Sequence, residues 1–221
     1  MDRQQDIAIR MQKAVQEGEI PGMVLALGDR HGMRMEAGFG ARSLGSAEAM
    51  APDSVFWIAS MTKAITGVAA MMLVEAGRLS LDAPANTLVP EIGALGVLEG
   101  FDEAGQPKLR PAKRPITLRH LLTHTSGYAY DMWSAEIGRF RAAMGTPAFR
   151  TGQNAALALP LLFDPGEDWS YGIGIDWAGK MVEAATGERL GAHLQRVIFE
   201  PLRSEEHTSE LQSHSDLVCR L

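Results

Sequence analysis

Ser60 and Lys63 are three residues apart, at the point where the short apolar run of residues 55–59 gives way to a helical pattern. On a helix, side chains three apart share one face with Cβ atoms about 5–6 Å apart, so the lysine amine can reach the serine hydroxyl. A serine hydroxyl is a weak nucleophile until a neighbouring base takes its proton, and a lysine partly stripped of water can assist in this. The pair therefore predicts a nucleophilic serine, although the spacing alone is also typical of an ordinary helix start with a solvent-facing lysine.

The composition is that of a globular protein and narrows the classes of partner. The chain has 221 residues, of which 46% are hydrophobic and 22% charged, and its net charge is −6. Such a charge gives no electrostatic reason to bind nucleic acid or an anionic membrane. The first residues lead into no apolar segment that could be a signal peptide, and the apolar run over residues 68–74 is too short to span a bilayer. We therefore expect a cytoplasmic protein with no nucleic-acid or membrane partner.

Residues 203–221 differ in character from the rest of the chain, being polar and without clear periodicity. They resemble a translated short-read sequencing adapter, so we expect a native domain over residues 1–202 and a non-native tail over 203–221. The only cysteine, Cys219, lies in this tail, which leaves no disulfide, thiol nucleophile or cysteine metal ligand in residues 1–202. On this interpretation the native domain is C-terminally truncated.

Hydrophobic periodicity and turn residues predict the elements that must position the serine. Strands are expected over residues 22–29 and 33–39, joined at His31-Gly32. Residues 78–114 are rich in glycine, proline and turns, and the polar stretch 102–114 within them is expected to be an exposed loop. The helix that begins at Ser60 is expected to run to about residue 76. Its predicted apolar face consists of Ile65, Val68, Met72 and Leu73. Further helices are predicted over residues 3–17, 117–124, 173–186 and 189–199, with Thr117 as a cap.

Two other patterns in the sequence are similar to known catalytic or metal-binding motifs. His120 and His124 are four apart, the spacing of a helical zinc pair, but the glutamate of a His-Glu-x-x-His motif is missing between them. Residues 41–45 are similar to a Gly-x-Ser-x-Gly nucleophile elbow around Ser43, but they lack its first glycine and its strand-turn-helix context. The sequence therefore predicts no metal site and no cofactor.

Three segments taken together match a known family. They are Ser60-x-x-Lys63, the Leu-Leu-Thr-His-Thr-Ser-Gly run of residues 121–127, and the segment from Trp169 to Tyr171 ahead of a helix. In this order the chain resembles the class C β-lactamase-related serine hydrolase family over residues 3–202, and within it the family VIII carboxylesterases most of all. The resemblance implies an α/β, β-lactamase-like (penicillin-binding-protein-like) fold, in which an antiparallel sheet is flanked by helices and a mostly helical region carries the tyrosine.

The resemblance also implies a role for each matched residue. Ser60 would be the acylated nucleophile, Lys63 would maintain its proton network, and Tyr171 would serve as the general base, which requires a phenolate stabilised by a nearby cation. The Ser60 amide would be one oxyanion donor. Without the family match, Tyr171 is better interpreted as an ordinary half-buried aromatic residue, and Tyr128 and Tyr130 could line the same pocket.

Two departures from the family pattern bear on the reaction. The third position of the Tyr-x-Asn element is Ile173, which cannot contact a lactam side chain as an asparagine amide would, so esterase chemistry is favoured. The Lys-Thr-Gly or His-x-Gly strand of the family is absent from residues 1–202. We expect a parent enzyme that cleaves short-chain acyl esters through an acyl-enzyme on Ser60, and a 221-residue chain that is itself inactive. The alternatives are a β-lactamase or D-Ala-D-Ala peptidase, with a β-lactam among its substrates, and a non-catalytic penicillin-binding sensor module.

Overall fold

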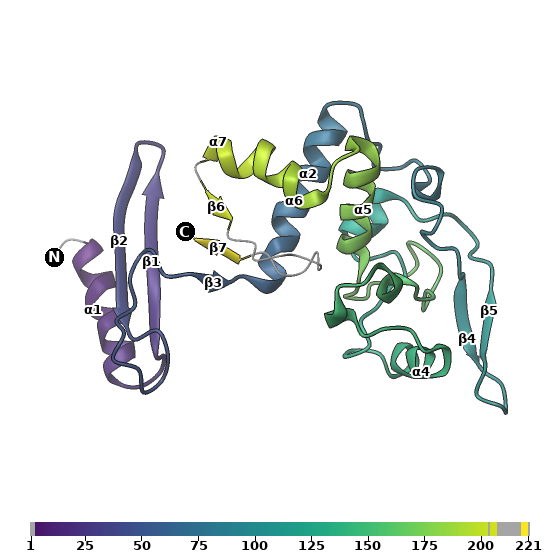
Figure 1. The fold of residues 1–221 in the computed structure, drawn as a ribbon, viewed down its shortest axis with the longest axis horizontal. Helices are drawn as coiled ribbons and strands as arrows, with labels where there is room; N and C mark the ends of the chain where they lie inside the picture. Colours follow the sequence, from purple (N-terminus) through teal and green to yellow (C-terminus); the bar gives the residue numbers. More distant parts are fainter. Residues whose placement is uncertain (1–2, 203, 207–217, 221) are drawn as a thin grey trace. The chain divides into compact units, whose positions relative to one another are not determined.

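The computed structural model describes residues 3–202, 204–206 and 218–220, and these fall into two compact units (Figure 1). The first unit contains the residues up to Trp57 together with 204–206 and 218–220, and the second contains residues 58–202. Ser60, Lys63 and Tyr171 all belong to the second unit. The geometry that relates these three residues is therefore internal to one compact body.

The first unit is built on an antiparallel hairpin. Strands β1 (Gly22–Asp29) and β2 (Gly32–Gly40) pair along their whole length, with one irregularity in register near the turn. Helix α1 (Arg3–Gln16) packs on β2, as its four-residue apolar spacing requires. The two predicted strands and the N-terminal helix are confirmed, and His31 lies in the turn between the strands.

A second sheet of the first unit joins the middle of the chain to its last residues. Strand β7 (Val218–Arg220) pairs with both β3 (Phe56–Trp57) and β6 (Glu205–Glu206), and both pairings are antiparallel. Two of these strands come from the tail that the sequence predicts to be non-native, and the boundary at residue 202 stays a prediction. The tail residues 203, 207–217 and 221 lie outside the described part of the chain.

Helices form the core of the second unit. Helix α2 (Thr62–Glu75) packs on α5 (Gly174–Thr186) and α6 (Leu190–Leu194), and α5 also packs on α3 (Leu118–Leu122). The helices predicted over these regions are confirmed. Full burial of each large apolar side chain in such a core contributes roughly 1.5–3 kcal/mol. The large apolar side chains that are completely buried where these helices meet include Leu118, Leu121, Ile173, Val182 and Leu194.

Helix α3 begins with a reciprocal cap, as predicted for Thr117. The Thr117 hydroxyl accepts a hydrogen bond from the His120 backbone N–H, and His120 Nδ1 accepts one from the Thr117 backbone N–H, each at 3.3 Å. These bonds satisfy amides that a helix start otherwise leaves unpaired. The imidazole of His120 is thus part of the helix cap.

The buried face of α2 differs from the predicted one. Val68 and Met72 are 51% and 40% exposed, so the predicted apolar face is wrong at these positions. Close packing of two helices favours small residues, and a Cβ placed on Gly179 of α5 would lie 3.7 Å from Thr66. Residues with short side chains therefore face the core in place of the larger ones. The buried residues of α2 are Thr62, Thr66, Ala69, Ala70 and Leu73.

An antiparallel hairpin lies where the sequence predicts an exposed loop. Strands β4 (Val97–Phe101) and β5 (Pro107–Arg110) pair across a turn in which the Asp102 carboxylate accepts a hydrogen bond from the Gln106 N–H at 2.8 Å. Gly105 takes a positive φ of 79°, which a side chain would disfavour. The prediction of an exposed loop over residues 102–114 is therefore wrong for β5, and β4 lies in the stretch expected only to be rich in turns. The turn at Asp102 and Gly105 is the signal in the sequence that favours a hairpin.

Asp164 ties this hairpin to the segment that precedes α5. Its carboxylate is fully buried and accepts two hydrogen bonds from the Arg110 guanidinium, at 2.9 and 2.7 Å. The carboxylate also accepts a hydrogen bond from the Lys113 backbone N–H at 2.8 Å, and Lys113 Nζ lies 3.2 Å from Asp164 Oδ2. These partners, with Arg110 first, hold the pKa of Asp164 well below its usual range. The ion pair therefore acts as an anchor for the hairpin.

The remaining elements are short. Among the described residues, no helix combines the length and apolar character that crossing a lipid bilayer requires. The remaining short elements are α4 (Ala135–Met144), α7 (Glu200–Leu202), the three-ten turns η1 (Ala59–Met61), η2 (Ala85–Thr87), η3 (Phe149–Thr151) and η4 (Asn154–Leu157), and the π-helical turn η5 (Gln195–Phe199).

Replacement of Asp164 by asparagine is expected to lower the melting temperature at pH 7 by at least about 5 °C, because it leaves two cations without their buried partner. A lowered pKa in the folded state contributes stability that is fully present above the unfolded-state value of 3.8 and is lost as the pH falls through the much lower folded-state value. Circular dichroism melts of the two proteins should therefore draw together progressively below about pH 4 and converge only in stronger acid, below the folded-state pKa of Asp164. The surface variant Glu91→Gln is the matched control. An Asp164→Asn melt equal to the native one at pH 7 would contradict the anchor.

Candidate active site

The three residues predicted to act together converge on one hydroxyl group. The Tyr171 hydroxyl donates a hydrogen bond to Ser60 Oγ at 2.9 Å, and Lys63 Nζ donates one to the same oxygen at 3.3 Å. Lys63 reaches Ser60 from the next helical turn, whereas Tyr171 comes from a segment 111 residues away. The Ser60 hydroxyl is therefore contacted by one cation and one phenol.

The serine lies at a tight start of its helix. Ala59, the residue before it, has a φ of 44°, which is uncommon for any residue with a side chain. Ser60 is the second residue of η1, and α2 follows directly at Thr62. Amides at the start of a helix lack an acceptor within the helix, and the helix dipole favours negative charge near them. The sequence prediction of a helix start at Ser60 is therefore confirmed to within two residues.

Two glycines bring the tyrosine segment against the core. A Cβ on Gly172 would overlap the Tyr128 carbonyl oxygen and lie 2.6 Å from the Ala129 Cα, and a Cβ on Gly174 would lie 2.6 Å from the Leu121 carbonyl oxygen. Only glycine permits so close a backbone approach. Tyr171 directly precedes Gly172, so its position is set by the packing of this segment on α3 and on the loop that follows α3.

Ile173, at the third position of the Tyr-x-Asn element, is completely buried. Its side chain packs in the core and offers no surface to a substrate. The described structure thus has neither an amide nor an exposed side chain at this position.

Tyr130 and Asp176 extend the cluster behind the lysine. Lys63 Nζ lies 5.3 Å from the ring centroid of Tyr171 and 5.5 Å from that of Tyr130, and the two rings are 5.4 Å apart. Cations at this distance from an aromatic face are attracted by the ring quadrupole. The Tyr130 hydroxyl donates a hydrogen bond to the Asp176 carboxylate at 3.3 Å. Sequence reasoning placed Tyr130 near the pocket without a role and overlooked Asp176.

The charges in this cluster depend on burial. Burial raises the pKa of Asp176 to about 6, an effect that the nearby Lys63 partly offsets. Burial, together with Asp176 and Tyr171, raises the pKa of Tyr130 well above its usual range. Tyr130 is therefore a neutral phenol at physiological pH, and Asp176 is mostly ionised.

His124 flanks the other side of the tyrosine. Its ring centroid is 4.8 Å from that of Tyr171 and 6.3 Å from that of Trp169. Burial, and then Lys63, lower the pKa of His124, so the ring is neutral at pH 7. Its φ is 57°, and its carbonyl oxygen accepts a hydrogen bond from the Ser170 N–H at 2.9 Å. His124 is thus part of the wall around Tyr171, which the zinc-like spacing with His120 did not indicate.

Tyr128 does not belong to the cluster. It is 2% exposed, and its hydroxyl accepts a hydrogen bond from the Gly93 N–H at 2.8 Å. The prediction that it lines the pocket of Ser60 is wrong, because its hydroxyl is engaged by the loop before β4. In the part of the chain that the structure describes, no three His, Cys, Asp or Glu side chains gather in a way that could hold a metal ion.

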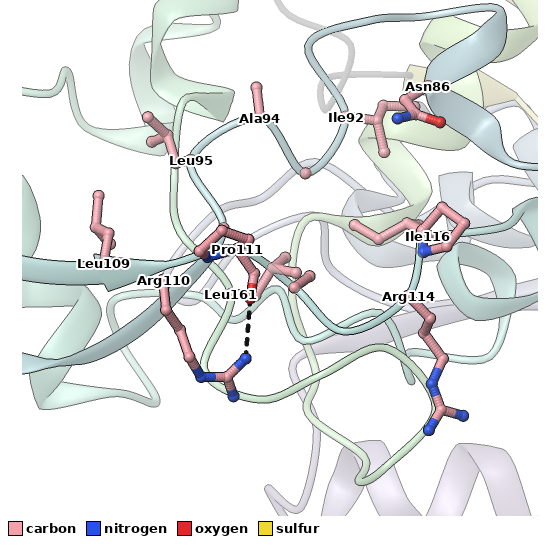
Figure 2. Close-up of a pocket in the computed structure, with 14 residues that line it drawn as sticks. Asn86, Ile92, Ala94, Leu95, Leu109, Arg110, Pro111, Arg114, Ile116 and Leu161 are labelled. Carbon is pink, nitrogen blue, oxygen red and sulfur yellow. Dashed lines mark hydrogen bonds between the residues drawn. The ribbon is translucent and has the colours of Figure 1, made fainter.

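A separate cavity of about 460 Å³ lies between the loop before β4 and the segment after β5 (Figure 2). Arg110 is one of the residues that line this cavity, and its guanidinium donates a hydrogen bond to the Pro111 carbonyl oxygen at 3.1 Å (Figure 2). The same guanidinium is already paired with Asp164. None of the residues around Ser60 lines the cavity. It therefore takes no part in the chemistry of the serine.

Comparison with known proteins shows the family of this chain. The family model named Beta-lactamase matches residues 7–214, which is most of the chain. The chain belongs to the Beta-lactamase family. The family match extends beyond residue 202, the predicted end of the native domain. The fold class and family that the three sequence segments imply are confirmed.

Members of the Beta-lactamase family that resemble this chain include both acyltransferases and esterases. It is 41% identical to acyltransferase mokF of Monascus pilosus over 94% of this chain and 52% of that protein, and 38% identical to lovastatin esterase of Penicillium rubens over 95% and 54%. Simvastatin synthase (LovD) of Aspergillus terreus has a similar structure, with a TM-score of 0.81 and 37% identity over 96% of this chain and 54% of that one. The chain spans about half the length of these relatives.

Replacement of Gly172 by alanine is expected to lower the reactivity of Ser60 by about 10²-fold, because the new methyl group must push the tyrosine segment away from Tyr128 and so displace Tyr171. The rate of Ser60 phosphonylation by a fluorophosphonate, followed by intact mass, measures this effect. The matched control is Gly191→Ala, since a Cβ on Gly191 of α6 meets nothing within 4 Å. Equal rates for the two variants would show that the close approach does not position Tyr171.

Proposed function

We propose that this protein is a carboxylesterase that cleaves short-chain acyl esters through an acyl-enzyme on Ser60. The observation that carries the proposal is that both Tyr171 and Lys63 lie within hydrogen-bond distance of Ser60 Oγ, at 2.9 and 3.3 Å. A serine needs an adjacent base to become a nucleophile, and a phenolate close to an ammonium group is such a base. In this proposal Ser60 is the nucleophile, Lys63 the electrostatic partner and Tyr171 the general base.

The first half of the reaction forms the acyl-enzyme. Ser60 Oγ attacks the ester carbonyl carbon while its proton passes to the Tyr171 phenolate, and the carbonyl oxygen becomes an oxyanion. The amide of Ser60, at the start of its helix, supports that negative charge. The tetrahedral intermediate then breaks the bond to the alcohol oxygen, which leaves with the proton that Tyr171 returns. Ser60 now carries the acyl group, and Tyr171 is again a phenolate.

The second half releases the acid. Water attacks the acyl carbonyl carbon, and its proton passes to Tyr171 as the new tetrahedral intermediate forms. When this intermediate collapses, the bond to Ser60 Oγ breaks and the serine recovers a proton from Tyr171. In this proposal the positive charge of Lys63, 5.3 Å from the centre of the Tyr171 ring, is the electrostatic partner of the negative charge that develops in each half. The tyrosine thus serves alternately as base and acid.

Acyl transfer to an alcohol is the second candidate function. The observation in its favour is that several relatives are named as acyltransferases, among them acyltransferase mokF at 41% identity and the monacolin J acid methylbutanoyltransferase of Aspergillus terreus at 40%. The same acyl-enzyme serves both reactions, since an acceptor hydroxyl can replace water in the second half. The difference lies only in which nucleophile reaches the acyl carbonyl carbon first.

Replacement of Ser60 by alanine is expected to abolish covalent labelling by a fluorophosphonate, which bonds to the serine oxygen with loss of fluoride. Ester hydrolysis by the protein expressed from its complete gene should fall by at least about 10³-fold. Intact-mass spectrometry and p-nitrophenyl acetate hydrolysis measure the two effects. Ser43→Ala is the matched control, because Ser43 is the centre of the rejected nucleophile-elbow pattern. Labelling that survives in Ser60→Ala, or is absent in the unmutated protein expressed from its complete gene, would refute the proposal, and the second result would favour a sensor module.

The reaction itself is distinguished by competition between substrates. With the protein from its complete gene, we expect p-nitrophenyl butyrate to be turned over faster than a chromogenic cephalosporin, because Ile173 removes the amide that would contact a lactam side chain. Addition of a primary alcohol then separates the two candidate functions by product analysis. Free acid as the main product supports the esterase, and a new ester supports acyl transfer. Faster cephalosporin turnover would overturn both.

A further inference from the structure

The cluster around Lys63 contains two tyrosines where the proposed reaction needs one base. Lys63 Nζ lies at almost the same distance from both rings, 5.3 Å for Tyr171 and 5.5 Å for Tyr130. On proximity to the cation alone, either phenol could lose its proton. If Tyr130 lost its proton, the positive charge of Lys63 would stabilise a phenolate oxygen that does not contact the serine.

The two hydroxyl groups have different partners. The Tyr171 hydroxyl contacts Ser60 Oγ at 2.9 Å, whereas the Tyr130 hydroxyl donates to the Asp176 carboxylate at 3.3 Å. An ionised carboxylate accepts hydrogen bonds and donates none, so it stabilises the neutral phenol of Tyr130 and repels its phenolate. Tyr130 is also only 4% exposed, which further disfavours a charge on it. Burial and Asp176 accordingly raise the pKa of Tyr130.

We propose that Asp176 is a positioning residue that assigns different roles to the two tyrosines flanking Lys63. By holding Tyr130 as a neutral hydrogen-bond donor, it leaves Tyr171 as the only phenolate that Lys63 can stabilise next to Ser60. This inference rests on the proposed function, in which Tyr171 is the base. Asp176 acts through Tyr130 and Lys63 and does not contact the reacting oxygen in the described structure.

The charged and titratable groups around Asp176 come from several segments. Lys63 belongs to α2, Tyr130 to the loop after α3, and Tyr171 to the segment before α5, with His124 on the far side of Tyr171. On α5 itself, the next charged residues are Lys180 and Glu183, which form an ion pair at 2.8 Å. The charge of Lys63 lowers the pKa of Asp176 and so partly offsets the effect of burial. The balance within the cluster is therefore one ammonium, one carboxylate and two phenols.

The experiment uses tyrosine labelled with ¹³C at Cζ, because the chain has only three tyrosines and each signal can be assigned by a Tyr→Phe variant. In the native protein the Tyr130 signal should stay that of a neutral phenol up to about pH 11. In Asp176→Asn, which keeps an acceptor oxygen but loses the charge, the onset of Tyr130 ionisation should move down by at least about one pH unit. If Asp176→Asn does not fold, the same titration is measured on Asp176→Ser. An unchanged Tyr130 titration would overturn the proposal.

A second measurement separates this role from a merely structural one. The rate of Ser60 phosphonylation should fall by up to about tenfold in Asp176→Asn above the pH at which Tyr130 begins to ionise, because the charge of Lys63 is then shared between two phenolates. Asp176→Glu should restore most of the rate. In a Tyr130→Phe background, which has no second phenol, Asp176→Asn should lower the phosphonylation rate much less. An equal fall in the rate in both backgrounds would show that Asp176 only supports the fold.

The two proposals fail in different ways. If Ser60 of the native protein is not phosphonylated, the proposed function fails, while the Tyr130 titration still reports on Asp176. If Ser60 is labelled normally but Asp176→Asn changes neither the Tyr130 titration nor the rate, only the present inference fails.

Discussion

The close approach of two backbone segments is the constraint on which the candidate active site depends. Gly172 and Gly174 lie so near residues 121–129 that a methyl group on either would meet backbone atoms, and this contact is possible only without side chains. It buries Ile173 completely and holds Tyr171, two residues earlier, within 2.9 Å of Ser60. The hydrogen bond between tyrosine and serine joins positions 111 residues apart, so its length follows from how α5 packs on α2 and α3. The helical core thus sets the chemical environment of the serine.

The charge of Lys63 is the main electrostatic feature of the cluster around Ser60. Lys63 is surrounded by aromatic faces and a partly buried carboxylate, and in such surroundings a charge acts more strongly than it would in water. Its effect on the serine depends on which neighbouring oxygen becomes negative. The relatives of this chain include both esterases and acyltransferases. That range is chemically consistent, since formation of an acyl-enzyme is common to hydrolysis and transfer, and only the second nucleophile differs.

Much of the fold could be predicted from the sequence, because the signals are local. Thr117 was expected to cap α3, and helix α5 was expected over nearly its observed bounds, since caps and apolar periodicity act within a few residues. The face of α2 could not be predicted, because Val68 and Met72 are apolar yet exposed while the small Ala69 and Ala70 are buried. Which stripe of a helix is buried depends on how closely its partner approaches. The hairpin at β4 and β5 was overlooked because its turn residues were interpreted as a loop.

The sequence by itself determined the contact between Ser60 and Lys63 and the family of the chain. Ser60 and Lys63 are three residues apart on a helix, so their contact follows from helical geometry alone. Only the tertiary structure decided that Tyr171 reaches the serine, that Tyr130 and Asp176 complete the cluster, and that Ile173 is turned into the core. These residues come from segments far apart in the chain, and no short-range pattern encodes a distance between them. Their arrangement follows from the packing of helices, which the glycines beside Tyr171 make possible.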